Sequence, residues 1–464
     1  MRLEFTGLRK ILIVLLCLVS SSLLWLSCGS SPSGGGTQTS GIKYRAFLTN
    51  NVAAGTASPG IFIVNAQTDV RGPSSPISAG NTPGMMVVSP NRAQTVVFSG
   101  NGTQFSDNQL SLINNASESN AAHVSLPGMT ESFVISPDGS AVYVAVPTAP
   151  VVGQSPGILE AISMSSGTVT GQVDVPALRY LSIDNGGDRL LGFSDNSDYV
   201  SVITPSQINI GNAVTTIGGP GIFDRPVAAF FSSDDTTAYV LSCGAECGGN
   251  QASVQQFSLV TNSLVASVPV CGPGTTQCAG SVALINGSTM YVAGTPYNSA
   301  GPSQPCTGQT TAATTCGLLT LINLTTMSVA NTAPIIITDG YHNRIALGAN
   351  GQLFIGARTC TEIIPPIPPP QGAEIRGCLS IYNTLTTAVG SVPAGGVLIP
   401  PANGDATGLQ PISTRQVVYV VQGGSLNIYD DTIDALEYNP NDPNNPGQIF
   451  GIIGNFIDVK TVDF

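Results

Sequence analysis

Residues that could do chemistry are sparse in this chain, of which only 9% is charged and which has only 2 histidines. Glu131, Arg179 and His342 stand out because a carboxylate, a guanidinium and an imidazole can together bind a polar ligand or move protons. They are weak catalytic candidates, since no nucleophile elbow, phosphate loop or zinc motif of recognised spacing accompanies them. The candidates for ligand binding are these basic residues and their neighbours: Arg179, Tyr180, Arg225, His342 and Arg344.

A second polar cluster is acidic and lies near the C-terminus: Asp430, Asp431, Asp434, Glu437 and Asp442. Clustered carboxylates could hold Ca²⁺, but their spacing matches no known calcium loop, and Asp is an ordinary turn residue. We therefore predict no metal and no cofactor, with a calcium site as the alternative. The net charge of −12 would repel phosphate backbones, which argues against nucleic acid as a partner.

Short strands must position these groups, because the chain has 53 Gly and 33 Pro and lacks long stretches of helical periodicity after residue 27. Residues 134–146 show the unit, in which two apolar strands flank Ser136-Pro137-Asp138-Gly139, a tight turn. Versions of this unit recur at intervals of about 50 residues. A large apolar residue marks the strand after each turn: Phe47, Val97, Tyr143, Leu191, Tyr239, Tyr291, Phe354 and Tyr419.

Four short strands in each repeat are the signature of a β-propeller blade. The Ser-Pro-Asp-Gly turn, a Val-Tyr-Val strand and a Val-Ser-Val-Ile strand, as at residues 200–203, resemble the YVTN-type propeller repeat over residues 45–464. In that family the strand before the turn is the innermost of its blade. This chain begins near Arg45 with a second strand and ends over residues 456–464 with a strand that no turn follows.

The last strand should therefore complete the first blade and close the ring. We predict an all-β propeller of four-stranded blades, eight in number, with seven as the alternative. In this geometry Glu131, Arg179 and His342 would ring one mouth of the central channel, where propellers usually bind ligands. The YVTN-like superfamily includes lactonases that use acidic, Arg and His groups at that mouth, but no lactonase-specific motif occurs here. The alternative, that these groups are only solvated strand ends, is the one we favour over an enzyme site.

The N-terminus predicts export to the cell envelope. Basic residues precede an apolar run over residues 11–25, which is short for a membrane span but right for a signal-peptide core. The sequence then resembles a bacterial lipobox with Cys28 as the lipidated residue, although Trp25 and Leu26 depart from the usual pattern. The predicted parts are a lipoprotein signal over residues 1–27, a flexible Gly/Ser tether over 28–41 and a propeller over 42–464. An ordinary secretory signal is the alternative; by the resemblance, Gly29 favours the outer membrane.

The remaining cysteines predict disulfides, because they are even in number in an exported chain: Cys243, Cys247, Cys271, Cys278, Cys306, Cys316, Cys360 and Cys378. From their positions within the repeat, all eight cysteines lie in or beside loops that follow the second or fourth strand of a blade. In a propeller these loops lie on the same face. Local pairing is the simplest choice, giving the pairs 243–247, 271–278, 306–316 and 360–378. A swap between the first two pairs is the main rival.

These features favour a lipid-anchored binding or scaffold module that takes an envelope protein or glycan as its partner. The rival is a lactonase-like hydrolase with its site at the channel mouth. A structural component of a surface layer is a third reading.

Overall fold

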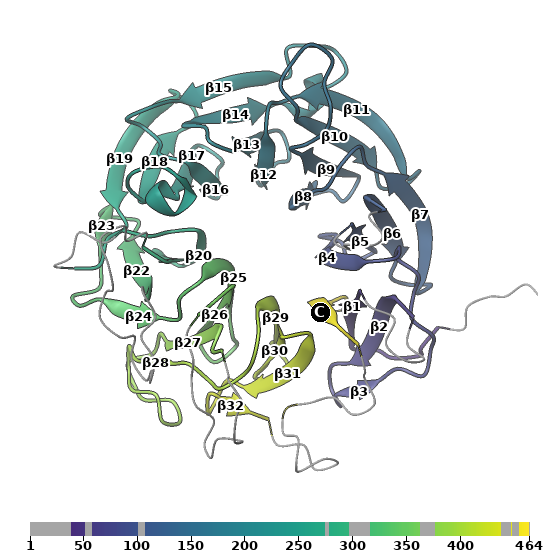
Figure 1. The fold of residues 1–464 in the computed structure, drawn as a ribbon, viewed down its shortest axis with the longest axis vertical. Coiled ribbons are helices and arrows are strands. Elements are labelled where there is room, and N and C mark those ends of the chain that lie inside the picture. Colours follow the sequence, from purple (N-terminus) through teal and green to yellow (C-terminus); the bar gives the residue numbers. More distant parts are fainter. Residues whose placement is uncertain are drawn as a thin grey trace, which may run out of the picture. The chain divides into compact units, whose positions relative to one another are not determined.

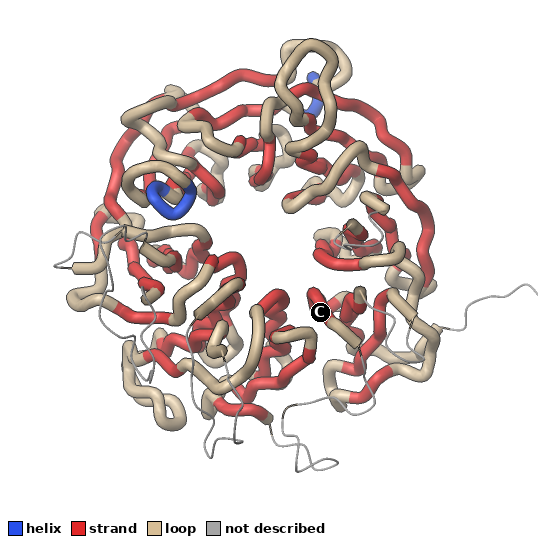
Figure 2. Tube along the Cα trace, in the orientation of Figure 1, coloured by secondary structure: helices blue, strands red, loops and turns tan. Residues whose placement is uncertain are grey.

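The computed structural model describes residues 39–51, 58–100, 107–273, 278–296, 316–361, 376–437, 447 and 454–463, all within one compact unit, Thr39–Phe464. In that unit eight antiparallel sheets stand as blades around a common axis (Figure 1). Strands dominate the described residues, and helix is confined to two short 3-10 turns (Figure 2). The predicted all-β propeller with eight blades is confirmed, and the seven-blade alternative is wrong.

The first four blades use the strands up to β15 and the last strand, β33. Blade 1 contains β33 (Phe456–Thr461), β1 (Arg45–Asn50), β2 (Gly60–Asn65) and β3 (Val70–Arg71). Blade 2 contains β4 (Pro83–Val88), β5 (Gln94–Ser99), β6 (Gln109–Asn114) and β7 (Ser119–Ser125). Blade 3 contains β8 (Ser132–Ile135), β9 (Ala141–Val146), β10 (Ile158–Ser163) and β11 (Thr168–Asp174). Blade 4 contains β12 (Leu178–Ile183), β13 (Leu190–Ser194), β14 (Tyr199–Ile203) and β15 (Val214–Gly218), with η1 (Pro205–Gln207) after β14.

The last four blades follow in the same order, with one extra strand in blade 6. Blade 5 contains β16 (Pro226–Phe231), β17 (Thr237–Ser242), η2 (Gly244–Cys247), β18 (Ser253–Ser258) and β19 (Ser263–Pro269). Blade 6 contains β20 (Val282–Asn286), β21 (Thr289–Gly294), β22 (Gly317–Asn323), β23 (Ser328–Val329) and β24 (Ile335–Ile337). Blade 7 contains β25 (Tyr341–Leu347), β26 (Gln352–Arg358), β27 (Leu379–Asn383) and β28 (Val397–Leu398). Blade 8 contains β29 (Ala406–Ile412), β30 (Val417–Gln422), β31 (Ser425–Asp430) and β32 (Ala435–Leu436).

The repeated turn is held by its own side chains. The Asp138 carboxylate accepts from the amide of Ser140 at 3.0 Å and from the hydroxyl of Ser136. Gly139 adopts φ +74°, a left-handed value that favours glycine. These bonds direct the chain from β8 into β9, so the short Ser-Pro-Asp-Gly sequence fixes the register of the two innermost strands.

Apolar side chains fill the boundaries between blades. Eight buried clusters occur among the described residues, and each joins one blade to its neighbour around the ring. Second strands supply much of this core because both of their faces are covered, and the marker residue Phe47 is fully buried. Burying one such side chain stabilises the fold by about 1.5–3 kcal/mol.

The two ends of the described unit meet in blade 1. Strand β33 pairs antiparallel with β1, so the last strand supplies the innermost position that the first blade would otherwise lack. Arg45 at the start of β1 donates through Nε to Asp463 at 2.9 Å, and its Nη1 lies 3.0 Å from Glu118 of blade 2. The predicted closure is confirmed, and these charges tie the closing strand to the first boundary of the ring.

The two faces of the ring differ in what they carry. The turn-bearing face holds the turns after first and third strands. The cysteine-bearing face holds the loops after second and fourth strands, where the described disulfides join Cys243 to Cys247, Cys271 to Cys278 and Cys360 to Cys378. These three local pairs are confirmed and the swapped pairing is wrong. Cys316 is disulfide-bonded, but Cys306, its predicted partner, lies outside the described residues.

The predicted signal, residues 1–27, and most of the tether lie outside the described residues, so the lipid anchor at Cys28 stays a prediction. In the part that the structure describes, no helix has the length and apolar character needed to cross a membrane.

Candidate functional site

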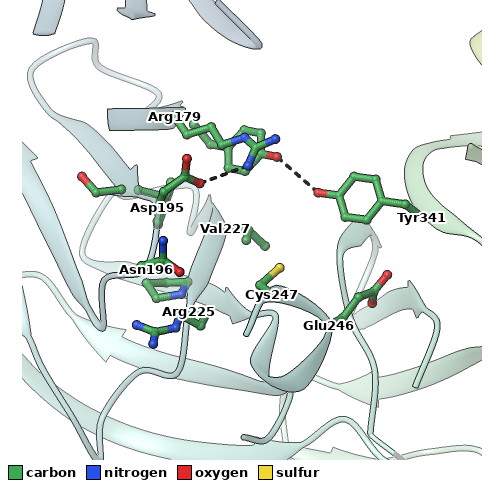
Figure 3. A pocket seen from close by; sticks show the side chains of 12 residues that line it. Arg179, Asp195, Asn196, Arg225, Val227, Glu246, Cys247 and Tyr341 are labelled. Atoms are coloured by element: carbon green, nitrogen blue, oxygen red, sulfur yellow. Dashed lines mark hydrogen bonds and ion pairs between the residues drawn. The ribbon is translucent and has the colours of Figure 1, made fainter. Parts of the chain in front are cut away.

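A cavity of about 390 Å³ lies on the cysteine-bearing face, between side chains of blades 4, 5 and 7 (Figure 3). The start of β12 and the loop after β13 form one wall, and the start of β16 with η2 forms another. Tyr341 at the start of β25 completes it. Because β12, β16 and β25 are innermost strands, their ends bring residues of separate blades together near the axis (Figure 1).

Arg179 organises the charged part of the cavity. Its Nη2 lies 2.8 Å from Glu131 Oε2, and its Nη1 lies 3.1 Å from Asp195 Oδ1. The guanidinium carbon also lies 5.2 Å from the centre of the Tyr180 ring. The three charged side chains are 35%, 54% and 42% exposed, so each ion pair stabilises by less than about 1 kcal/mol. The network therefore serves mainly to orient and neutralise the guanidinium.

The hydroxyl groups of two tyrosines from different blades contact each other in the cavity. The hydroxyl oxygens of Tyr180 in blade 4 and Tyr341 in blade 7 lie 3.2 Å apart. Burial raises the pKa of both hydroxyls, so both are protonated at neutral pH and one can donate to the other. Blades 4 and 7 are not neighbours, so this hydrogen bond joins opposite sides of the cavity.

Arg225 and Glu246 supply the polar groups of the blade 5 wall. Arg225 Nη1 lies 3.3 Å from Asp198 Oδ1, so this cation is also paired. Glu246 lies in η2, which the Cys243–Cys247 disulfide holds, and it accepts from the amide of Thr295 at 3.1 Å. Burial raises the pKa of Glu246 to about 8, so most molecules carry a neutral carboxylic acid here at pH 7.

His342 and Arg344 are not among the residues that line the cavity, unlike Arg179, Tyr180 and Arg225. The His342 side chain is fully buried, and burial lowers its pKa to about 4, so the imidazole is neutral. Arg344 lies further along β25, where its Nε donates to the carbonyl of Thr407 at 2.7 Å. Of the six candidate residues, three line the cavity, Glu131 pairs with Arg179, and His342 and Arg344 do not line it.

The acidic cluster of the last blade does not form a single site. Glu437 pairs with Arg415, and Asp430 accepts from the amide of Thr432 at 2.8 Å. Asp442 lies outside the described residues. No group of three or more His, Cys, Asp or Glu within the described ranges is arranged to hold a metal ion.

Sequence reasoning missed several residues that line the cavity, among them Asp195, Glu246 and Tyr341. Asp195 and Glu246 lie in loops after second strands, a region that sequence reasoning had marked only by its cysteines. The signal that could have found Glu246 was its place beside Cys247, because a disulfide fixes the loop around it. Tyr341 directly precedes His342, so strand alternation could have pointed to it instead of the histidine.

No model of a known protein family matches this chain, and no curated protein matches it. The YVTN-type assignment therefore stays a prediction. Among solved structures, dihydro-heme d1 dehydrogenase NirN in complex with DHE is 13% identical with a TM-score of 0.56, over 94% of this chain and 78% of that one.

Two further solved structures resemble this chain with lower TM-scores. Kuenenia stuttgartiensis hydrazine synthase is 16% identical with a TM-score of 0.45, over 66% of this chain and 78% of that one. The β-propeller domain of Myceliophteria thermophila Cps50 (Swd1) is 8% identical with a TM-score of 0.46, over 75% of this chain and 96% of that one. At these identities the likeness concerns the fold alone.

Proposed function

We propose that this chain is a non-enzymatic binding module of the bacterial envelope, and that its ligand is a neutral glycan held in the cavity of blades 4, 5 and 7. The observation that carries the proposal is the pair Tyr180 and Tyr341, which meet across that cavity. A tyrosine offers an apolar ring and a polar tip, which suits a sugar with its apolar faces and many hydroxyl groups.

The charges of the cavity favour a neutral ligand over an ionic one. Arg179 and Arg225 are each paired with carboxylates, so their positive charges are already balanced and do not require an anionic ligand. Paired groups still present fixed donors and acceptors, and such groups give orientation and specificity in a mostly preformed pocket. The protonated Glu246 adds a donor without adding charge.

A binding role suits the site better than hydrolysis by a histidine base. His342 is buried outside the lining, and the other histidine, His123, lies on β7, the outermost strand of blade 2. Neither imidazole can therefore take a proton from a substrate held in the cavity. The lactonase-like hydrolase stays the competing proposal.

The proposed location in the cell envelope rests on the N-terminal sequence. We infer that Cys28 carries a lipid and that residues 28–41 tether the propeller to the membrane. Substituting Cys28→Ala should abolish incorporation of labelled palmitate in a bacterial host and release the chain from the membrane fraction. Labelling that persists in Cys28→Ala would show that no lipid is attached there.

The ligand proposal is tested by probing an array of bacterial envelope glycans with the full-length chain. We expect binding to a subset of neutral glycans, weakened at least about tenfold in Tyr341→Ala, because one aromatic anchor is lost. The matched control is Tyr199→Ala, since Tyr199 is half-exposed on β14 and does not line the cavity. Equal binding by Tyr341→Ala, or turnover of a lactone panel that Glu246→Gln abolishes, would contradict the proposal.

A further inference from the structure

At one boundary of the ring, an acidic turn residue lacks the arginine that its equivalents have at two other boundaries. The turn between the third and fourth strands holds an acidic residue with positive φ in three blades: Asp69 (54°), Glu118 (51°) and Asp434 (53°). Three residues before each acid, an amide donates to the carbonyl just before the second strand of the same blade. The residues with these amides are Ala66, Asn115 and Asp431, so the three acids occupy equivalent positions.

In two of these three places an arginine from the preceding blade neutralises the acid. Arg415 of blade 8 lies 2.6 Å from Asp69 of blade 1 through its Nη1 and that carboxylate's Oδ1. Arg45 of blade 1 lies 3.0 Å from Glu118 of blade 2. The pattern is that a guanidinium from the start of one second strand meets the acid of the next blade.

At the boundary between blades 7 and 8 the equivalent residues are uncharged. Asn350 corresponds to Arg415, since each lies two residues before a second strand, and Gln352 corresponds to Arg45, since each is the first residue of that strand. Asn350 donates its amide to Asp431 Oδ2 at 3.0 Å, which shows that this turn contacts blade 8. Gln352 is fully buried and donates to Asn383.

The acids of blade 8 are therefore left uncompensated in the interior. Asp434 is 2% exposed, and within the described part of the chain neither of its carboxylate oxygens has a hydrogen-bond partner. Asp431 is 0% exposed, and its Oδ1 also has none. A buried carboxylate without partners is strongly unfavourable, so the two free oxygens of Asp434, together with Asp431 Oδ1, point to a missing positive charge.

We propose that a Ca²⁺ ion binds Asp431 and Asp434 at the boundary between blades 7 and 8, where it takes the place of the arginines used at the other two boundaries. Carboxylate oxygens are the ligands that Ca²⁺ prefers, and one divalent ion balances two of them. Two carboxylates do not fill the coordination of Ca²⁺, so the proposed site requires further oxygen ligands from backbone carbonyls or water.

Thermal unfolding of the full-length chain tests the site. After treatment with EDTA and dialysis, adding millimolar Ca²⁺ should raise the Tm of the wild type by about 3 °C, because the ion binds only the folded state. Asp434→Asn should lose this response, and in EDTA it should be at least as stable as the wild type, since it removes an unpaired charge. Asn350→Arg should raise the Tm in EDTA and also abolish the response, because its guanidinium copies that of Arg415.

The matched control is Asp69→Asn, which removes the equivalent acid at another boundary. It should lower the baseline Tm but keep the full Ca²⁺ response. Isothermal titration of Ca²⁺ should find one site per chain in the wild type and in Asp69→Asn, and none in Asp434→Asn or Asn350→Arg. An unchanged wild-type Tm with no calorimetric site, or an equal response in Asp434→Asn, would overturn the proposal.

Discussion

The two faces of the ring use similar residues in different ways. On the turn-bearing face, charged groups pair between adjacent blades and are nearly buried, as Arg45 and Glu118 are with 11% and 5% of their side chains exposed. On the cysteine-bearing face, Arg179 and its partners are a third to a half exposed and surround a cavity. Buried pairs between neighbours hold the ring together, whereas exposed groups from separate blades leave room for a ligand.

The difference follows from where strands end. A short turn after a third strand reaches the preceding blade, so its acid pairs across one boundary, as Asp69 does with Arg415. The loops after second strands lie near the starts of innermost strands, so groups from blades 4, 5 and 7 can converge. Under the proposed function, the pairs that hold the ring together and the groups that bind the ligand lie at opposite ends of the strands.

The largest effect should come from breaking the closure on the turn-bearing face. Arg45→Ala leaves the buried Glu118 and the partly buried Asp463 without their cation, so we expect a loss of about 3–5 kcal/mol in the free energy of unfolding. Denaturation in urea measures it. Lys43→Ala removes an exposed charge two residues away and should change stability by less than about 0.5 kcal/mol. A loss in Arg45→Ala no larger than in Lys43→Ala would mean that these charges do not close the ring.

A smaller effect, on the other face, should separate stability from binding. Removing the Cys360–Cys378 bond, with a sequence separation of 18, should cost about 3 kcal/mol, because it closes the longer loop. Removing the Cys243–Cys247 bond, with a separation of 4, should cost about 2 kcal/mol but weaken glycan binding more, since Cys247 lines the cavity. Double alanine variants compared by urea unfolding and by the glycan array test this. If removal of the Cys360–Cys378 bond weakened glycan binding more than removal of the Cys243–Cys247 bond, η2 would not be part of the binding site.

A further effect should appear in the pH dependence of stability. The raised pKa of Glu246 means that its contribution becomes unfavourable as pH rises from about 4.5 to about 8, because the folded state resists losing the proton. The lowered pKa of His342 acts in the opposite sense, and stability is lost as pH falls from 6.5 to about 4. Glu246→Gln should flatten the alkaline side of the Tm curve and leave the acidic side unchanged. A curve that is unaltered above pH 5 would show that Glu246 titrates normally.

The repeat made most of the fold predictable from the sequence. All eight marker residues, from Phe47 to Tyr419, lie in second strands, and the turn Ser136-Pro137-Asp138-Gly139 has the conformation that its residues favour. The closing strand was predictable for the same reason, since the first blade lacked an innermost strand. Turn chemistry and alternation are local, so a single sequence carries them.

The candidate site was only partly predictable, because a bulge changes which side chains face the cavity. The pairing of β25 with β26 shifts register between His342 and Arg344, and a similar shift occurs in β12 between Leu178 and Tyr180. A bulge re-aims the residues beside it, so the position of His342 in the sequence did not reveal that it is buried. Contacts between distant blades, such as that of Tyr180 with Tyr341, leave no local signal either.

Hydrogen–deuterium exchange of the full-length chain, with and without a glycan that the array identifies, tests the division between the faces most directly. The account predicts ligand-dependent protection at residues 178–196, 225–227, 244–247 and 341, with no change in the turns that hold Asp69, Glu118 and Asp434. Protection confined to those turns, or to the outer strands, would contradict it and would place the ligand away from the cavity.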